Sequence, residues 1–410
     1  MVVTNCRMCK STSLIKYLDL GFTPAADDFL TKERLQYPET HYPLEVFVCQ
    51  DCGQSQLGYV VPADVLFGKD YVYEMSITAA GKKHWAEFAA YVSKRFKLGT
   101  KDLVVDIGSN VGVLLDEFSN NGVKVLGVDP APTLAKIAND NGIDTICNFF
   151  GLRVAKEILQ KKGPASVITG TNVFAHINDL DELMKGVNVL LKDDGIFIFE
   201  SPYFVNLIER LEYDTIYHEH LSYLSVKPLI DFFKCFGMEI FFIEEKDIHG
   251  GSFRVYIDRI GNRPISGIVD KLLKREEEAN LYSLITLNRF AKNVSQNRQQ
   301  LHEMLADLKR NNKKIAAVSA PAKGMTLLNY CKIGSETLEF VTEKSQLKIG
   351  KFTPGMHLPV VPDSELISKK IDYALLLAWN FADEIMSNLK AYTEAGGKFI
   401  IPIPEPRIVG

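Results

Sequence analysis

The chain has 410 residues, of which 46% are hydrophobic and 24% are charged, so it holds ample material for packed cores. Its 47 basic and 51 acidic residues give a net charge of -4, which counts against a role centred on binding DNA or RNA. The longest apolar runs, such as Tyr373–Trp379, are far shorter than the roughly 20 residues of a membrane-spanning helix, and Met1–Lys10 lacks a signal-peptide core. We therefore expect a soluble, cytoplasmic, monomeric protein of about two to four domains, with no nucleic-acid partner and no membrane.

Residues 1–70 are rich in turns and aromatic residues, with short strand-like runs such as Leu44–Val48 and no long helical period. They carry four of the seven cysteines, in two pairs that each enclose two residues. Four thiolates on two such knuckles are typical of a closed tetrahedral zinc site, which supports folding and takes no part in chemistry. A small domain with little hydrophobic core needs a further stabilising element, such as a bound metal ion. The ligands predicted for this structural zinc ion are Cys6, Cys9, Cys49 and Cys52.

Two other interpretations of the cysteine pairs are weaker. Redox-active pairs usually open a helix after a strand, and neither pair does so. A zinc ribbon that binds nucleic acid needs basic residues, but Gly21–Leu57 contains only Lys32 and Arg34 as lysine or arginine. The other three cysteines are expected to be small buried residues: Cys147, Cys235 and Cys331.

From Tyr73 to about Ile260, buried strand-like runs alternate with helical stretches, which is typical of a parallel sheet built from βαβ units. The runs are Leu103–Ile107, Val123–Val128, Ser166–Thr169 and Gly195–Phe199. We expect an antiparallel hairpin to end this sheet, formed by Met238–Ile243 and Ser252–Ile257 around a His-Gly-Gly turn.

Residues 266–312 are charged, with apolar residues three and four apart, and predict a connecting pair of helices. Strands then alternate with helices again, so a second α/β unit is expected at the C-terminal end. Its predicted strands are Lys314–Ser319, Leu338–Val341, Tyr373–Ala378 and Lys398–Pro402. The predicted class is α/β, with units at residues 1–72, 73–260 and 261–410.

A glycine loop follows the first strand of the middle unit and opens a helix. Gly108 and Gly112 let the backbone approach a ligand at the carboxyl end of the sheet. Asp129 ends the next strand, 21 residues after Gly108, where a carboxylate can accept hydrogen bonds from both ribose hydroxyls. Asp106 places negative charge beside the loop, which disfavours a diphosphate and suits a ligand with an amine and a sulfonium. A glycine-rich turn without a ligand is the alternative.

These residues resemble the cofactor site of class I S-adenosylmethionine-dependent methyltransferases, with Asp106, Gly108 and Gly112 on the first motif and Asp129 on the second. The resemblance implies that Asn148 and Phe149 flank the adenine. The full set expected to bind the cofactor is Asp106, Gly108, Asn110, Gly112, Asp129, Asn148, Phe149 and Asn172.

A second polar segment, Tyr217-His218-Glu219-His220, follows the fourth parallel strand. Neutral imidazole suits the removal of a proton near pH 7, and a neighbouring carboxylate or phenol can orient it. His176 follows the strand Ser166–Thr169, so it should lie at the same edge of the sheet as the glycine loop. Chelation of a metal by the two histidines of the segment, or simple capping of a loop, are the alternatives left open.

Several segments together resemble the deoxysugar C-methyltransferases, which methylate carbon 3 of a nucleotide-linked keto sugar. They are Cys6-x-x-Cys9, Tyr217-His218-Glu219-His220, His249-Gly250-Gly251-Ser252, Ala320–Gly324, Phe352–Gly355 and Gly396–Pro402. The resemblance implies a zinc-binding domain at 1–72, an S-adenosylmethionine-binding domain at 73–260, and a domain at 261–410 that holds the substrate nucleotide, dTDP or GDP.

The same resemblance implies that His220 is a general base that removes the C3 proton and generates an enolate. Tyr217 and Glu219 would assist it, while His176 and Tyr71 would contact the sugar. The chain departs from the family's sequence pattern at the strand end Ala317–Pro321 and at Glu343. Both positions lie in the C-terminal unit, so they affect the nucleotide preference more than the methyl chemistry. An O- or N-methyltransferase with the same cofactor site, and a zinc-ribbon binding protein with a degenerate methyltransferase domain, remain as alternatives.

Overall fold

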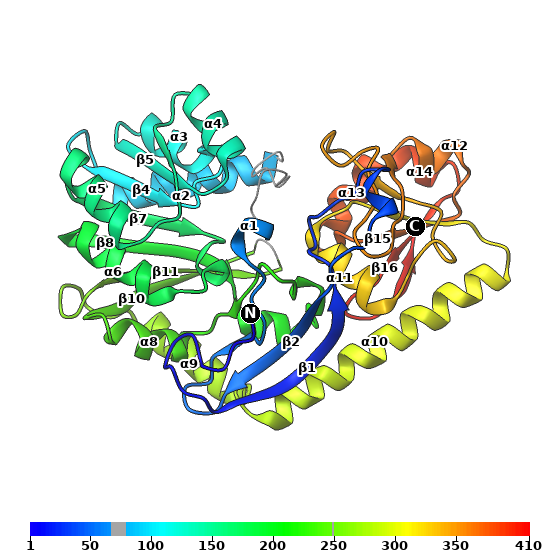
Figure 1. Cartoon of the computed structure of the whole chain (residues 1–410), viewed down its shortest axis with the longest axis horizontal. Helices are drawn as coiled ribbons and strands as arrows, with labels where there is room; N and C mark the ends of the chain where they lie inside the picture. The colour runs from blue at the N-terminus through cyan, green and yellow to red at the C-terminus, as the bar shows by residue number, and fades with distance from the viewer. Residues whose placement is uncertain (67–78, 248–249) are drawn as a thin grey trace.

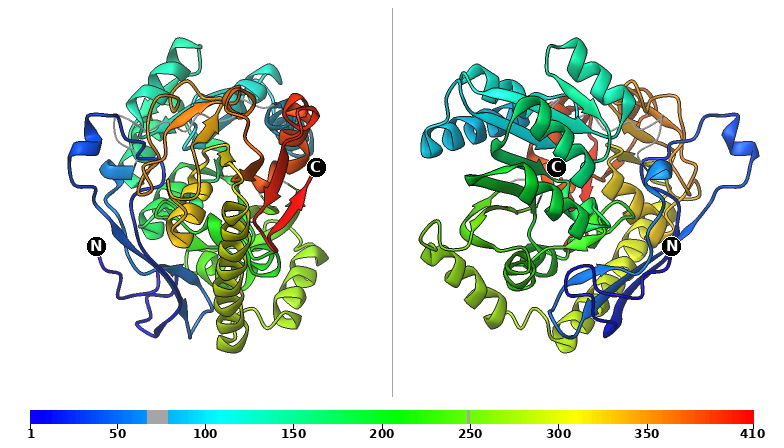
Figure 2. Two further views of the ribbon diagram at one scale, coloured as in Figure 1. Left: turned by 90° about the vertical axis from the view of Figure 1, so that its right-hand side faces the viewer. Right: turned by 60° about the vertical axis from the view of Figure 1, so that its left-hand side comes forward.

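The structure is a computed structural model of the chain, and it describes residues 1–66, 79–247 and 250–410. Figure 1 shows two α/β units side by side, with the curved strands β1 (Leu14–Thr23) and β2 (Tyr42–Cys49) and the helix α10 (Leu284–Arg310) running beneath them. The views in Figure 2 place α10 along the N-terminal strands, and β1 packs directly on it. None of the helices in the described ranges combines the length and apolar character that crossing a bilayer requires.

The middle unit is a seven-stranded sheet in the order β10-β11-β8-β7-β4-β5-β6. The run from β8 to β6 is parallel, while β11 and β10 are antiparallel to their neighbours. The strands are β4 (Leu103–Ile107), β5 (Lys124–Asp129), β6 (Thr145–Cys147), β7 (Ala165–Thr171), β8 (Leu191–Pro202), β10 (Met238–Lys246) and β11 (Ser252–Arg259). The predicted parallel strands and the terminal hairpin are confirmed.

Helices flank this sheet because each carries one apolar face. In α2 (Ala79–Phe96), Trp85, Phe88, Ala89 and Val92 recur three and four apart and are all buried against the strands. The other helices of this unit are α3 (Val113–Asn120), α4 (Pro132–Asp140), α5 (Leu152–Lys162), α6 (Leu180–Leu190), α7 (Phe204–Glu209) and α8 (Val226–Lys234), with short 3-10 turns η2 (Phe174–His176) and η3 (Tyr213–Thr215).

The N-terminal sheet contains a strand from far along the chain. Its order is β1-β2-β3-β9, all antiparallel, where β3 is Ser55–Leu57 and β9 is Ser222–Tyr223. A 3-10 turn η1 (Arg34–Gln36) and the short helix α1 (Ala63–Leu66) complete this region. Because β9 begins two residues after His220, the N-terminal sheet is joined to the segment Tyr217-His218-Glu219-His220 through the main chain.

The predicted connecting helices are α9 (Gly267–Glu278) and α10, and the C-terminal sheet follows them in the order β14-β13-β12-β15-β16-β17. The neighbours are parallel except for the edge strand β17. The strands are β12 (Ile315–Val318), β13 (Val341–Glu343), β14 (Val360–Pro362), β15 (Tyr373–Leu376), β16 (Lys398–Ile401) and β17 (Arg407–Val409), with helices α11 (Ala322–Cys331), α12 (Glu365–Ser368), α13 (Ala382–Asn388) and α14 (Lys390–Glu394) and the 3-10 turn η4 (Trp379–Phe381).

Two expectations were wrong in detail. The strand predicted at Leu338–Val341 begins only at Val341, because Leu338 and Phe340 are buried from an irregular segment rather than from a strand. Cys147 and Cys235 are exposed, and only Cys331 of the remaining cysteines is buried. Cys147 is the last residue of the edge strand β6 and Cys235 is the residue after α8, so both lie at exposed ends of elements.

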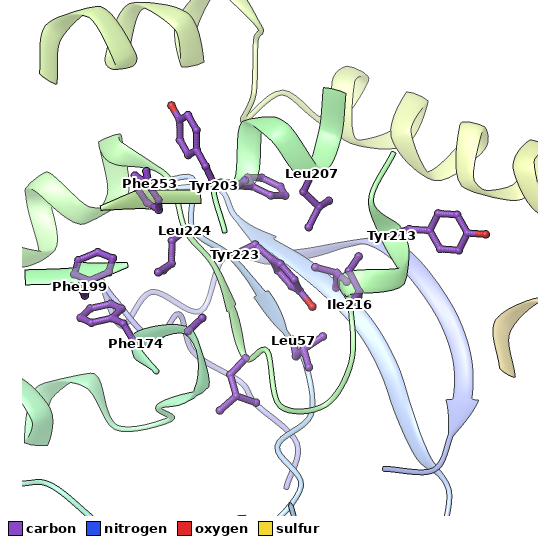
Figure 3. Packing of buried hydrophobic residues seen from close by; sticks show 14 of the residues in the cluster. Leu57, Phe174, Phe199, Tyr203, Leu207, Tyr213, Ile216, Tyr223, Leu224 and Phe253 are labelled. Atoms are coloured by element: carbon purple, nitrogen blue, oxygen red, sulfur yellow. The ribbon is translucent and has the colours of Figure 1, made fainter. Parts of the chain in front are cut away.

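A buried aromatic core supports the ends of β7 and β8, as Figure 3 shows. The ring of Phe174 stacks on Phe199 with 4.6 Å between centroids, and Tyr203 stacks on Phe253 at 4.8 Å. Stacked aromatic pairs combine large buried area with a defined geometry, so they hold the loops that leave these strands in place.

Candidate active site and metal centre

The four cysteines predicted to bind zinc lie together, brought there by the first knuckle and the end of β2. All four Sγ atoms lie within 4.8 Å of one another, with 3.6 Å between Cys6 and Cys52 and 3.5 Å between Cys9 and Cys49. Thiolates bound at about 2.3 Å to a tetrahedral zinc ion stand about 3.8 Å apart, so the cluster fits zinc. Within the described ranges, no other group of three or more cysteine, histidine or acidic side chains could hold a metal.

The pKa values of these neighbouring thiols also indicate that a cation belongs among them. Hydrogen bonding with Cys52 lowers the pKa of Cys6 to about 5, while burial raises the pKa of Cys9 to about 11. The neighbouring Cys6 raises the pKa of Cys52. Thiols this close cannot all ionise unless a positive charge sits among them, and zinc supplies that charge.

The glycine loop has the backbone that the motif predicts. Gly108 and Gly112 adopt φ angles of 68° and 84°, in the left-handed region that favours glycine. A Cβ atom on Gly108 would lie 2.2 Å from Cγ2 of Val173, and the Gly108 N–H donates to the Val128 carbonyl at 2.8 Å. The loop therefore packs closely against the carboxyl ends of β5 and β7.

Two buried carboxylates lie beside this loop. Asp106 accepts the Thr169 hydroxyl at 2.6 Å, while Asp129 accepts the N–H groups of Asn110 at 2.8 Å and Ala131 at 2.9 Å. Burial raises the pKa of Asp106 to about 7 and also raises the pKa of Asp129. A carboxylate with two N–H donors keeps further lone pairs, so Asp129 retains the acceptor capacity that ribose hydroxyls need.

The other residues expected at the cofactor lie along the same edge. The N–H of Asn148 donates to the Asp129 carbonyl at 3.1 Å, and the ring of Phe149 beside it is 55% exposed. Asn172 has a φ of 55°, donates its N–H to the Glu200 carbonyl at 2.8 Å, and lines a cavity. His176 and His220 line the same cavity, so Asn172 lies between the glycine loop and the histidine segment.

His220 lies at the centre of a cluster of rings. Its Nδ1–H donates to the Thr215 carbonyl at 2.7 Å, because a carbonyl oxygen can only accept. The neutral ring then carries its lone pair on Nε2, the atom that can take up a proton. The ring centroid of His220 lies 4.0 Å from that of Tyr217 and 4.9 Å from that of His176.

His176 and His218 are neutral at pH 7, because the pKa of each lies below its ordinary value. Burial, with a smaller contribution from His220, lowers the pKa of His176 well below its ordinary value. Burial lowers the pKa of His218 to about 4, and the ring of His218 lies edge-on to Tyr42 of β2 with 5.7 Å between centroids. His218 thus packs on the N-terminal sheet, and the described residues bring no third metal ligand to His218 and His220.

Glu219 lies where the three units meet. Burial and the nearby Asp27 raise its pKa well above its ordinary range, against the opposing effect of Lys348. Lys348 joins the other two units, because its Nζ lies 3.1 Å from the Asp27 carboxylate and donates to the Ala320 carbonyl at 2.9 Å. The structure therefore places Glu219 in an interdomain polar cluster.

The histidines line a cavity whose polar wall was not anticipated from the sequence. Asn172, His176, Thr215 and His220 contribute to this wall. Three further lining hydroxyls are buried without a hydrogen-bond partner in the described part of the chain: those of Ser201, Ser222 and Tyr223. Buried polar groups are nearly always paired, so we expect water or a polar ligand to pair with these hydroxyls. The sequence feature that could have revealed this polar wall is the pair Glu200-Ser201, which follows the apolar residues of β8.

The C-terminal unit approaches the segment that leads to the histidines. The indole N–H of Trp379 donates to Asp214 at 2.7 Å, and Lys323 Nζ lies 3.7 Å from the same carboxylate oxygen. Lys323 also lies 4.2 Å above the Trp379 ring. Two residues named from the sequence, Tyr71 and His249, lie outside the described residues.

Three family models match the chain in succession. One is a zinc binding domain over residues 6–67, one a methyltransferase domain over residues 81–241, and one the "C-methyltransferase C-terminal domain" over residues 247–404. The C-methyltransferase NovU of Streptomyces niveus is 36% identical over 408 residues, which cover 99% of this chain and 97% of that protein.

Other similarities are confined to part of the chain. An uncharacterized methyltransferase of Schizosaccharomyces pombe is 26% identical over 178 residues, 42% of this chain and 64% of that protein. A solved S-adenosylmethionine-dependent methyltransferase from Clostridium acetobutylicum aligns with a TM-score of 0.36 and 15% identity, covering 44% of this chain and 92% of that one.

Proposed function

The chain belongs to the C-methyltransferase family and uses S-adenosylmethionine, and from this premise we propose that it methylates carbon 3 of a nucleotide-linked 4-keto deoxysugar. The observation that carries the proposal is the arrangement of His220, whose Nδ1–H donates to the Thr215 carbonyl, so that the basic lone pair of the neutral ring is on Nε2. Methylation of a hydroxyl or an amine does not remove the C3 proton, so exchange of C3–H is the step that distinguishes this proposal from those alternatives.

A base alone is insufficient, since the pKa of C3–H lies far above that of histidine. As His220 Nε2 takes the proton, the electrons of the C3–H bond move toward the C4 oxygen, which becomes an enolate. Donors at that oxygen stabilise the charge by about 2.7–4 kcal/mol each in comparable sites. His176, neutral at pH 7, and Tyr217 are the candidates in the described ranges, because both rings lie beside His220.

When bound, S-adenosylmethionine supplies the methyl group, which the enolate carbon takes in line as the sulfur–carbon bond breaks. Asp129 and the glycine loop would hold the ribose side of this cofactor, and Asn148 with Phe149 the adenine. Asp106 would face its positive charge. The buried hydroxyls of the cavity, such as that of Ser222, suit a substrate with several oxygen atoms.

The division of labour among the units is part of the proposal. We assign the structural zinc to residues 1–72, the cofactor to 73–260 and the substrate nucleotide, dTDP or GDP, to 261–410. Lys323 and Trp379 support the last assignment, since they bring a cation and an aromatic face toward the histidine segment. Assistance to the base by Glu219, contact of Tyr71 with the sugar, and a cytoplasmic monomer all stay predictions.

The test uses a C3-deuterated keto sugar linked to dTDP or GDP, with S-adenosylhomocysteine in place of the methyl donor. Wild type should wash the label into water, and His220→Asn should lose this exchange by about 10²–10⁴-fold. A parallel assay with S-adenosylmethionine should show the same loss of methylation. Affinity for the cofactor should be unchanged, and His302→Asn, at an exposed histidine of α10, is the control.

Two results would redirect the proposal. If His220→Asn exchanges and methylates as fast as wild type, while His176→Asn or Tyr217→Phe stops both, the base is the other residue. If a methyl group is gained while the C3 label is retained, the acceptor is a hydroxyl or an amine and the carbon-acid mechanism is wrong.

A further inference from the structure

Arg7 lies between two zinc ligands, yet its side chain leaves the zinc centre and enters the interface with the middle unit. The residue is 5% exposed. Its Nη1 donates to the carbonyls of Leu57 at 3.0 Å and Leu221 at 3.1 Å, and its Nε donates to Oδ1 of Asn178 at 3.3 Å. One guanidinium thus bonds to three segments that are far apart in the sequence.

Two of these partners flank the histidines of the cavity. Leu221 directly follows His220, and Asn178 lies two residues after His176. The loops that carry the two histidines come from different strands, and their rings lie 4.9 Å apart. Arg7 is therefore a link between the histidine loops that does not itself pass through the cavity.

Further hydrogen bonds hold the Leu221 carbonyl and the main chain of Arg7 in place. The Leu221 carbonyl accepts a second hydrogen bond, from the N–H of Leu57 at 3.0 Å, and β9 extends the N-terminal sheet immediately afterwards. On the other side, the Arg7 N–H donates to Oε1 of Gln56 at 2.8 Å. The planar fork of a guanidinium fixes several acceptors at once, which a flexible ammonium group does less well.

We propose that Arg7 is a positioning residue through which the zinc knuckle sets the placement of His220 relative to His176. Zinc bound by Cys6 and Cys9 fixes the main chain on both sides of Arg7, and so fixes the origin of its side chain. The proposal rests on the proposed function for the roles of the two histidines, while their placement can be measured without any substrate. A purely stabilising role for Arg7 is the alternative that the test must separate.

The placement is measured by NMR of isotope-labelled histidine rings in the full-length zinc-bound protein. The chain has eight histidines, and the spectra of His176→Asn and His220→Asn identify the two signals. In Arg7→Met we expect both signals to shift or broaden, while the His302 signal and a content of one zinc per chain stay unchanged. Lys16→Met removes an exposed cation of the same sheet and is the matched control.

Two more variants separate positioning from stability. Asn178→Ala, at an exposed residue, removes only the contact with the His176 loop and should move that signal alone. Arg7→Lys keeps the charge without the fork and should give intermediate shifts. With a keto sugar that wild type methylates, Arg7→Met should lower kcat by up to about 100-fold, as expected for a small misplacement of reacting groups, with KM for the cofactor unchanged.

The outcomes distinguish this proposal from the proposed function. If both histidine signals stay in place in Arg7→Met while wild type methylates a keto sugar, the positioning role fails and the proposed function stands. If the signals move but wild type neither exchanges C3 deuterium nor methylates, the proposed function fails and the placement role stands. Should Arg7→Met not fold, an unmoved His176 signal in Asn178→Ala overturns the proposal.

Discussion

Asp106 should make cofactor binding depend on pH. Its carboxyl is 2% exposed, accepts the Thr169 hydroxyl at 2.6 Å, and shares the carboxyl edge of the sheet with the charge of Asp129. Burial is the largest cause that raises its pKa to about 7. Near pH 7, about half of the chains without ligand therefore carry a proton on this carboxyl.

We predict that the affinity for S-adenosylmethionine rises between about pH 6 and pH 8, because the cationic ligand favours the ionised carboxylate. With a pKa of about 7, the ionised fraction rises from about one tenth to about nine tenths over this interval, so the dissociation constant should fall about tenfold, or ~1.4 kcal/mol. Without ligand, the raised pKa means that the folded state binds this proton more tightly than the unfolded chain. Its contribution to stability then falls as the pH rises from about 4 to about 7.

Titration calorimetry at pH 6, 7 and 8 measures the affinity, and buffers of different ionisation enthalpy give the number of protons released. At pH 7 we expect about half a proton per ligand. Asp106→Asn should abolish the pH dependence, whereas Asp129→Asn should retain most of it while weakening binding. Equal wild-type affinity at pH 6 and pH 8, or an unchanged slope in Asp106→Asn, would refute this reasoning.

Three further predictions concern the zinc and cofactor sites. Metal analysis should find about one zinc per chain, retained in His218→Ala; a chain without zinc, or loss of zinc in that variant, contradicts the assigned ligands. In calorimetry, Asp129→Ala should weaken cofactor binding by roughly 1.5–3 kcal/mol per lost charge-assisted hydrogen bond, and unchanged affinity would mean that the ribose lies elsewhere. Gly108→Ala and Gly122→Ala share a positive φ, so both should lower the Tm. Only Gly108→Ala, whose Cβ would meet Val173, should also lower cofactor affinity, and equal affinities in the two variants would show that the loop tolerates a side chain.

The sequence predicted strands that contain a clear apolar run, such as β4. All five residues of Leu103–Ile107 are buried and all but Asp106 are apolar, so the run between Asp102 and Gly108 marks both ends of β4. Strand β1 was not predicted, because its register with β2 shifts twice and its burial does not alternate regularly. The two-residue strand β9 carries no periodic signal, since its pairing depends on β3, which lies over 160 residues earlier in the chain.

The site shows the same division between local and distant information. The cysteine knuckles and the glycine loop have spacings that translate directly into local geometry, so both were located from the sequence. The surroundings of Glu219 could not be predicted from the sequence, because they depend on Asp27 and Lys348, which are 321 residues apart. The role of Arg7 was hidden for the same reason, since its bond to Leu221 spans 214 residues.

The two histidines of the cavity should act as one base and one neutral donor. Two imidazoles with 4.9 Å between centroids repel each other when both are protonated, so a proton on His220 keeps His176 neutral. The Thr215 carbonyl, which accepts from His220 Nδ1, also stabilises the cation that His220 becomes. The neutral ring of His176 then still carries one N–H, which would donate to the enolate oxygen as the charge develops.

This arrangement predicts different losses for two replacements of similar size at His176. His176→Gln keeps a neutral N–H donor and should retain C3 exchange within about tenfold, whereas His176→Leu removes the donor and should lose about 2.7–4 kcal/mol of transition-state stabilisation, or 10²–10³-fold. Deuterium washout at pH 7 compares the two variants directly. Equal rates would mean that His176 only fills space beside His220, and Tyr217 would then be the remaining described donor for the enolate oxygen.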